Sequence, residues 1–145
     1  MSGPLVSVYI PTYNRCSLLA RALSSVRTQD YRNIEIIVVD DGSIDGTIDY
    51  MDMICREDSR VKFIKKNFNS GACESRNLAI ETARGEYLTG LDDDDYFMPG
   101  RISNFVSTWR DDFVASYTDS VLVRKGGINR VIRRWPAFSP DIFRN

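Results

Sequence analysis

Residues 34–43 read Ile34-Glu-Ile-Ile-Val-Val-Asp-Asp-Gly-Ser43, a nearly continuous apolar run that breaks at an acidic turn. Such a run is typical of a strand buried on both faces of a parallel sheet. An earlier strand is predicted at Leu5-Val-Ser-Val-Tyr-Ile10, and we expect it to stop at Pro11 because proline cannot donate a ladder hydrogen bond.

Helical patterns alternate with these apolar runs. Between the first two strands, Leu18, Leu19, Ala22, Leu23 and Val26 recur at a spacing near 3.6 and predict an amphipathic helix over residues 16–28. Strands that alternate with helices indicate crossover units, so the expected fold class is α/β, with a mostly parallel sheet flanked by helices on both faces. The remaining expected elements are a helix after Asp45-Gly46-Thr47, a strand at 61–64, a helix at 72–83 closed by Gly85, a strand at 86–91, a helix from Pro99 to about Trp109, strands at 113–117 and 120–124, and a hairpin turn at Gly126-Gly127 into a strand at 128–132.

Composition narrows the possible functions. The chain has 145 residues, of which 43% are hydrophobic and 27% charged, as in a soluble single domain. Nineteen Lys and Arg against twenty Asp and Glu give a net charge of -1, so no overall positive field exists to hold nucleic acid. The absence of histidine excludes Ser-His-Asp, Cys-His and His-metal chemistry.

The cysteines and the N-terminal residues indicate the cellular compartment of the protein. Cys16, Cys55 and Cys73 are widely spaced and odd in number, which argues against a zinc site or a disulfide framework. We expect them to be small buried residues in a reducing compartment. No apolar run approaches the ~20 residues of a membrane span, and Met1 to Leu5 lack the charged region and apolar stretch from which a signal peptide would be predicted. The chain is therefore predicted to be cytoplasmic, with peripheral association at the inner face of the membrane left open.

Three unusual segments follow predicted strands: Pro11 to Arg15, Asp40 to Ser43, and Asp92 to Asp95. In parallel α/β sheets, ligands collect outside the carboxyl ends of the strands. The sequence therefore predicts a ligand site that all three segments line.

Four consecutive aspartates are the most unusual of these segments, because adjacent carboxylates repel one another unless a cation or a turn compensates. An extended chain would send Asp92 and Asp94 to one side and Asp93 and Asp95 to the other. Carboxylates without nearby His or Cys favour Mg²⁺ or Mn²⁺, which usually completes its shell with substrate phosphates. The alternative is that these are N-cap and turn acids ahead of the helix at Pro99, above all Asp95.

Other residues at this edge allow two interpretations each. Asp41 could accept a hydrogen bond from a nucleobase or ribose, or could cap the next helix, whereas Asp40 lies nearer the strand and is expected to be structural. Tyr13 could stack on a base or belong to the core. Arg15 and Arg76 could contact phosphate, or could be solvated or paired with acids.

Five motifs follow one another along the chain: Val6-Ser-Val-Tyr-Ile-Pro-Thr-Tyr-Asn-Arg15, Val38-Val-Asp-Asp-Gly-Ser43, Asn69-Ser-Gly71 with Ser75-Arg-Asn77, Ala83-Arg-Gly-Glu-Tyr87, and Leu91-Asp-Asp-Asp94 through Pro99. In this order they resemble family 2 glycosyltransferases over roughly residues 5–110. The resemblance implies a GT-A fold, a nucleotide-sugar donor (most often a UDP-sugar) and a divalent metal.

The same resemblance implies roles at the donor site. The backbone at Pro11 and the ring of Tyr13 match the nucleobase cradle, and Asp41 matches the carboxylate that recognises the base. Asp93 is expected near the ribose or sugar and Asp94 on the metal that bridges the diphosphate.

With four aspartates in a row, a second register stays open, in which Asp92 is the first carboxylate of the Asp-x-Asp-type element. The bound metal would neutralise charge on the leaving nucleoside diphosphate while an acceptor hydroxyl attacks from the opposite face, so the reaction would invert the anomeric centre. The base would be an Asp or Glu, and no residue is assigned to it.

Family members usually continue into an acceptor-binding half, whereas this chain ends at Asn145. The resemblance therefore implies that residues 1–145 are the donor-binding domain without the full acceptor half, acting with a saccharide or lipid-linked saccharide acceptor in polysaccharide or glycoconjugate synthesis. One alternative is a non-catalytic nucleotide-sugar-binding module. A second is a phosphoacceptor receiver domain, which would carry paired acids after its first strand. A purely structural domain would leave the four adjacent aspartates unexplained.

Overall fold

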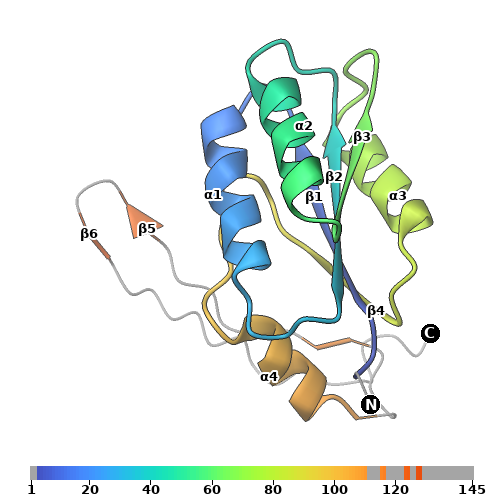
Figure 1. Cartoon of the computed structure of the whole chain (residues 1–145), viewed down its shortest axis with the longest axis vertical. Coiled ribbons are helices and arrows are strands. Elements are labelled where there is room, and N and C mark those ends of the chain that lie inside the picture. The colour runs from blue at the N-terminus through green and yellow to red at the C-terminus, as the bar shows by residue number, and fades with distance from the viewer. Residues whose placement is uncertain (1–2, 111–114, 117–122, 125–126, 129–145) are drawn as a thin grey trace, which may run out of the picture. The chain divides into compact units, whose positions relative to one another are not determined.

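The computed structural model describes residues 3–110, 115–116, 123–124 and 127–128. The chain divides into two compact units, Met1–Thr108 and Trp109–Asn145. The first unit carries a four-stranded sheet and four helices, which confirms the α/β class (Figure 1). In the second unit, β5 (Val123–Arg124) pairs with β6 (Gly127–Ile128) in antiparallel fashion.

The sheet of the first unit is wholly parallel, in the order β3-β2-β1-β4. Its strands are β3 (Val61–Lys65), β2 (Ile34–Asp40), β1 (Val6–Thr12) and β4 (Tyr87–Gly90). Every residue of β2 is buried, as predicted for a strand covered on both faces. The carboxyl ends of the strands therefore meet at one edge of the sheet.

The expectation that the first strand stops at Pro11 is wrong, because β1 continues to Thr12. Along a parallel strand, successive residues turn their peptide groups to alternate neighbours. The Tyr9 carbonyl accepts a hydrogen bond from the Leu91 N–H on the β4 side, so Pro11 faces the same side. The ladder with β4 ends at the pair of Tyr9 with Gly90, and Pro11 therefore removes no ladder bond.

Helices cover both faces of this sheet (Figure 1). α1 (Cys16–Arg27) and α2 (Thr47–Glu57) pack on one face, and α3 (Ala72–Thr82) packs on the other. The predicted start of the second helix is confirmed, since Asp45 Oδ1 accepts a hydrogen bond from the Thr47 N–H at 3.0 Å.

The apolar stripe predicted for the first helix forms the centre of the core. Its fully buried members are Leu19, Ala22, Leu23 and Val26, which pack against Val8, Ile10, Ile36 and Val38 of the sheet. A smaller cluster between the sheet and α3 consists of Ile37, Val39 and Ala79.

Two glycines differ from the sequence-based expectations. α3 ends at Thr82 and the next residue is extended, so Gly85 is not its C′ glycine. Gly85 is instead needed for close packing, because a Cβ there would lie 2.5 Å from the Ser7 nitrogen of β1. Gly127 lies in a strand rather than in the hairpin turn, opposite Arg124. Gly126 and most of the strand residues predicted between 113 and 132 lie outside the described residues.

The last helix of the first unit, α4 (Arg101–Thr108), begins at Arg101 rather than at Pro99. Gly100 has a φ of +75°, which a right-handed helix cannot include. None of the helices within the described part of the chain is long and apolar enough to cross a bilayer.

The cysteines are less buried than predicted. Cys16 and Cys55 are half-buried and Cys73 is exposed. Cys16 and Cys73 lie in the first turns of their helices, and Cys55 lies at the margin of the core. All three lie off the apolar stripes that fill the core.

Candidate functional site

The carboxyl ends of β1, β2 and β4 open onto a cleft of about 320 Å³. The predicted ligand edge of the sheet is thus a concave surface. All five residues predicted to bind donor or metal line it: Pro11, Tyr13, Asp41, Asp93 and Asp94. Arg15, Arg76 and Asp92 line it as well, together with Asn69 and Gly71 of the β3–α3 connection, which belong to a motif of the resemblance but were given no role.

The loop after β1 presents Tyr13 to this cleft. Its side chain is 44% exposed, so the core interpretation of Tyr13 is wrong. The following residue, Asn14, has a φ of +52°, in the left-handed region that asparagine tolerates. Its backbone N–H donates to Ser43 Oγ, and its side-chain oxygen accepts from the Ile44 N–H, each at 2.8 Å. These two bonds, called here the Asn14 clasp, tie the first loop to the second.

The first acidic turn (Asp40–Ser43) is built around two buried carboxylates. Asp40 has no exposed surface and accepts hydrogen bonds from the backbone N–H and the hydroxyl of Ser43. Asp40 therefore closes its own turn, in line with its expected structural role.

Asp41 reaches across to the β3–α3 connection instead of capping α2. Its carboxylate accepts hydrogen bonds from Lys66 Nζ at 2.6 Å, from the Ser70 N–H at 3.0 Å and from the Gly71 N–H at 2.8 Å. Burial by itself would raise the pKa of Asp41, but these three donors outweigh burial and hold its pKa below the ordinary value. Asp41 is therefore an ionised, nearly buried carboxylate at the wall of the cleft.

Lys66 is a site residue that sequence reasoning missed. Besides Asp41, its ammonium contacts the hydroxyls of Ser70 and Ser75. Gly71 has a φ of +97°, which lets this connection turn its N–H groups toward Asp41. The available signal was two consecutive lysines, Lys65 and Lys66, directly after the strand predicted at residues 61–64.

The second acidic turn (Asp92–Asp95) is not extended, so the predicted alternation of its side chains is wrong. The Asp95 N–H donates to the Asp92 carbonyl oxygen at 3.0 Å, and the chain turns at the two central residues. As a result Asp93 and Asp94 contact the same guanidinium nitrogen, Arg15 Nη1, at 3.1 and 3.2 Å.

The carboxylates of this second turn differ in burial and in partner. Asp93 is 5% exposed and also accepts a hydrogen bond from the Thr12 hydroxyl at 2.8 Å. The exposed side chain of Asp92 pairs with Arg76 Nη2 at 2.7 Å. Arg15 and Arg76 thus pair with acids of this turn, and the cleft lining holds four carboxylates, with Asp41 the fourth, and two guanidiniums.

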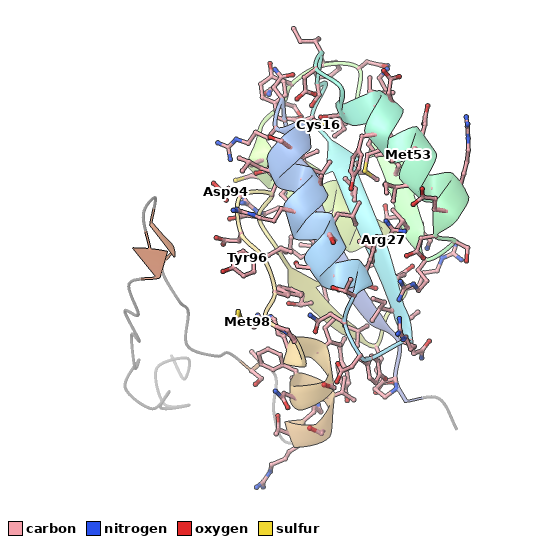
Figure 2. The ribbon with its side chains drawn as sticks, turned by 60° about the vertical axis from the view of Figure 1, so that its left-hand side comes forward. Cys16, Arg27, Met53, Asp94, Tyr96 and Met98 are labelled. Atoms are coloured by element: carbon pink, nitrogen blue, oxygen red, sulfur yellow. The ribbon has the colours of Figure 1, made fainter. Side chains whose placement is uncertain are left out.

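Helix α1 fixes the backbone that leaves this turn. Arg21 donates to the Asp94 carbonyl oxygen and stacks on the Tyr96 ring, 5.4 Å from its centroid. Figure 2 shows Asp94, Tyr96 and Met98 following one another beside α1. Burial and the charges of Asp94 and Asp92 raise the pKa of Asp95.

The acids form a turn, as that alternative held, but they do not cap α4, so its N-cap part is wrong. The first N–H groups of α4 find other partners: Arg101 donates to the Met98 carbonyl, and Ile102 donates to Gln29 Oε1 at 3.2 Å. The buried Gln29 also donates to the Met98 carbonyl at 3.0 Å. Gln29, which follows the end of α1, therefore supplies the cap, and sequence spacing alone does not reveal this.

The donor set of the cleft fits a hard divalent cation that shares its shell with a ligand. Within the described residues, no group of three or more His, Cys, Asp or Glu side chains is arranged to hold a metal ion alone. The carboxylates of Asp93 and Asp94 both contact Arg15 Nη1, so these two side chains could contact one cation together. They would fill only part of its coordination shell. Mg²⁺ or Mn²⁺ held by one or two carboxylates takes its remaining oxygens from water and phosphates.

Comparison with known sequences gives one family. The family model "Glycosyl transferase family 2" matches residues 7–144. The putative colanic acid biosynthesis glycosyl transferase WcaA of Escherichia coli K12 is 46% identical over 106 residues, 73% of this chain and 38% of that protein. The GalNAc(5)-diNAcBac-PP-undecaprenol beta-1,3-glucosyltransferase of Campylobacter jejuni is 32% identical over 128 residues, 88% of this chain and 41% of that protein.

A third relative is the UDP-Glc:alpha-D-GlcNAc-diphosphoundecaprenol beta-1,3-glucosyltransferase WfaP of Escherichia coli. It is 43% identical over 100 residues, which are 69% of this chain and 39% of that protein. The chain spans 38% to 41% of the length of these curated relatives.

Solved structures agree with the fold. The mannosyltransferase PcManGT of Pyrobaculum calidifontis, in complex with GDP-Man and Mn²⁺, aligns with a TM-score of 0.69 at 27% identity over 76% of this chain and 33% of that one. TarS 1-349 of S. aureus, in complex with UDP-GlcNAc, aligns with a TM-score of 0.65 at 31% identity over 70% and 30%. These likenesses confirm the expected GT-A architecture.

Proposed function

The chain belongs to glycosyltransferase family 2, and from this membership we propose that residues 1–145 form the donor-binding domain of an enzyme that transfers a sugar from a nucleotide to an acceptor hydroxyl. The observation that carries the proposal is the convergence of Tyr13, Asp41, Asp93 and Asp94 on one cleft. That cleft combines an exposed aromatic ring with carboxylates of the kind that hold a divalent cation. A nucleoside diphosphate sugar needs both.

The base of the nucleotide is proposed to lie against Pro11, Tyr13 and Asp41. An exposed tyrosine ring can stack on a base, which contributes about 1–3 kcal/mol in nucleic-acid systems. A carboxylate has about four lone-pair sites, and Asp41 uses three of them on Lys66, Ser70 and Gly71. The remaining site suits a ring N–H such as that of uracil, and UDP is the proposed nucleotide because the WfaP relative is named for UDP-Glc and TarS is solved with UDP-GlcNAc.

The diphosphate is proposed to lie against the second acidic turn, with Mn²⁺ or Mg²⁺ as the cofactor. Asp94 is the proposed metal ligand, and Asp93 lies toward the ribose or sugar, held by Thr12. This register is favoured over the one that begins at Asp92, because Asp93 and Asp94 share one partner while Asp92 pairs separately with Arg76. When bound, the metal supplies neutralisation of the charge that develops on the departing nucleoside diphosphate.

The acceptor is proposed to be a saccharide or a lipid-linked saccharide, in polysaccharide or glycoconjugate synthesis. Support comes from the names of the Campylobacter and WfaP relatives. Both names describe a glucosyltransferase together with a saccharide that is linked to undecaprenol. An acceptor of that kind would bring the enzyme to the cytoplasmic face of a membrane. Attack of its hydroxyl from the face opposite the nucleotide would invert the anomeric centre.

Calorimetric titration of the whole chain with UDP, GDP and TDP, each with and without Mn²⁺, tests the donor site. We expect UDP to bind only with Mn²⁺ and the Asp94→Ala variant to lose at least about tenfold in affinity, or 1.4 kcal/mol. Asp52→Ala, the same change on the exposed surface of α2, is the matched control and should bind as the wild type does. A folded wild-type chain that binds none of the three nucleotides would contradict the proposal.

Sugar transfer separates an enzyme from a non-catalytic binding module. UDP-glucose, Mn²⁺ and a polyprenyl-diphosphate-linked acceptor sugar are incubated with the chain, and the product is followed by mass spectrometry. Transfer that stops in the Asp94→Ala variant supports the enzyme. Nucleotide binding without transfer to any such acceptor would favour the binding module.

A further inference from the structure

We infer that Arg15 competes with the divalent cation for the carboxylates of Asp93 and Asp94. When the cation binds, Arg15 leaves these carboxylates and binds the diphosphate, so that cation binding and nucleotide binding are coupled. The inference deepens the proposed function and rests on it. It concerns a residue of the first loop for which sequence reasoning left phosphate contact and ion pairing as alternatives.

The geometry places one nitrogen between two carboxylates. Arg15 Nη1 lies 3.1 Å from Asp93 Oδ1 and 3.2 Å from Asp94 Oδ2. Within the described residues, these are the polar contacts of the Arg15 side chain, which is 51% exposed. A cation that binds Asp93 and Asp94 together must approach the same oxygens, so it displaces the guanidinium.

Arg21 and Arg76, which also lie near the turn, do not contact the carboxylates of Asp93 and Asp94. Arg21 donates to the backbone carbonyl of Asp94 and stacks on Tyr96, and neither contact uses a carboxylate oxygen. Arg76 pairs with Asp92 alone. Arg15 is therefore the residue whose removal would change the charge felt at the paired carboxylates without disturbing the backbone of the turn.

The diphosphate offers Arg15 a replacement for the pair it gives up. A guanidinium binds phosphate oxygens at least as well as carboxylate oxygens, through two parallel hydrogen bonds. Since the Arg15 side chain is long and half-exposed, it can turn from the acids to a phosphate lying in the same cleft. Each ligand then removes an obstacle to the other, which is positive coupling between metal and nucleotide.

The test measures Mn²⁺ binding to the whole chain directly, by electron paramagnetic resonance of the unbound ion, with and without saturating UDP. Arg15→Met is compared with the wild type, and Arg15→Gln serves as a second variant if the first does not fold. Arg56→Met, which removes the same charge from the surface of α2, controls for the change in net charge. Thermal unfolding followed by circular dichroism verifies that each variant is folded.

We expect Arg15→Met to bind Mn²⁺ about twofold to tenfold more tightly than the wild type when no nucleotide is present, as the strength of exposed ion pairs suggests. The factor by which UDP tightens Mn²⁺ binding should shrink in this variant. By linkage, the factor by which Mn²⁺ tightens UDP binding must shrink equally, which calorimetry checks independently.

Two results would overturn the inference, and they differ in what else they overturn. If the wild type binds UDP and Mn²⁺ while Arg15→Met binds Mn²⁺ no more tightly than Arg56→Met does, the competition is absent and the proposed function stands. If neither the wild type nor the variants bind Mn²⁺, both the inference and the metal dependence of the proposed function fail.

Discussion

The two acidic turns at the edge of the sheet look alike in sequence and differ in their partners. In the first acidic turn, Asp40 and Asp41 are buried, and backbone N–H groups and Lys66 bind them. In the second acidic turn, Asp92 and Asp94 are more than half exposed, and the partners are arginine side chains. Donors of the first kind are part of the fold, whereas those of the second kind can be exchanged for a ligand.

The difference follows from where the two turns lie in the sheet. β2 is central and buried, so any carboxylate that follows it must be fully hydrogen-bonded within the protein. β4 is an edge strand of alternating burial, and water can solvate the acids after it. The predictions at Asp41, Asp94 and Asp93 test whether burial of the carboxylate decides between a structural and an exchangeable role, and the last prediction tests the contact between two loops of the cleft.

The largest effect is expected for Asp41→Ala. It leaves the ammonium of Lys66, whose side chain is only 15% exposed, beside two unpaired N–H groups, and should lower the free energy of unfolding by about 3 kcal/mol. The same change at Asp94 should alter it by less than about 0.5 kcal/mol. Urea unfolding of both variants measures the contrast, and equal losses would contradict it.

Asp93 is the buried member of the exposed turn, and its removal should give an intermediate loss. Asp93→Ala leaves the Thr12 hydroxyl without its acceptor and should cost about 2 kcal/mol in free energy of unfolding. A double-mutant cycle with Thr12→Val isolates that hydrogen bond. Strictly additive losses would show that this bond does not anchor the turn.

The third prediction concerns acid. The pKa of Asp41 is below its ordinary value in the folded chain, so its carboxylate stabilises the fold above an unfolded-state pKa of about 3.9, and that stability is lost as the pH falls through the folded pKa. The difference in unfolding free energy between the wild type and Asp41→Asn should therefore be constant near pH 7 and shrink below about pH 4, by at most about 1.4 kcal/mol per pH unit.

Urea unfolding of both proteins at pH 7, 4, 3 and 2 measures this difference. Asp58, whose pKa is also lowered, by Arg60 and Arg27, remains in both chains and cancels in the comparison. A difference that stays constant down to pH 2 would show that the folded chain does not hold the Asp41 carboxylate in its ionised form.

The sequence predicts which residues share the cleft because the carboxyl ends of parallel strands meet at one edge. Tyr13, Asp41 and Asp94 each follow a predicted strand, and the structure brings them together. Whether each of them binds donor or metal is a separate prediction, which the titrations above test. The α/β fold could be predicted as well, because β2 is a continuous apolar run and the apolar residues of α1 recur with a helical period.

Partners far apart in the chain could not be predicted. Arg15 and Asp93 are separated by 78 positions, and their contact depends on a turn where the residue pattern suggested extended backbone. The roles of Lys66 and Gln29 could not be predicted for the same reason. Lys66 binds Asp41 and Gln29 binds the Met98 carbonyl, and only folding brings these partners together. Motif spacing locates groups along strands and helices, but it does not give the direction of a side chain in a turn.

A smaller loss of stability than at Asp41 or Asp93 is expected at the Asn14 clasp, which joins the loop of Tyr13 to the first acidic turn. Asn14→Gly keeps the left-handed φ of +52° and loses the bond to the exposed Ile44, so it should lower the unfolding free energy by less than about 1 kcal/mol. Asn14→Ala also strains the backbone and should lose about 1 kcal/mol more. Urea unfolding measures both, and equal losses would contradict a role of backbone conformation at this position.

Titration of the same two variants with UDP and Mn²⁺ tests what the clasp does for the cleft. If Asn14→Gly keeps most of its stability but binds UDP severalfold more weakly, the clasp positions Tyr13 from a turn that is itself fixed by Asp40. The rigid acidic turn then contributes to binding at a distance, through a loop it does not belong to. Unchanged affinity would mean that Tyr13 holds its position independently, and the two turns would be separate in function as well as in structure.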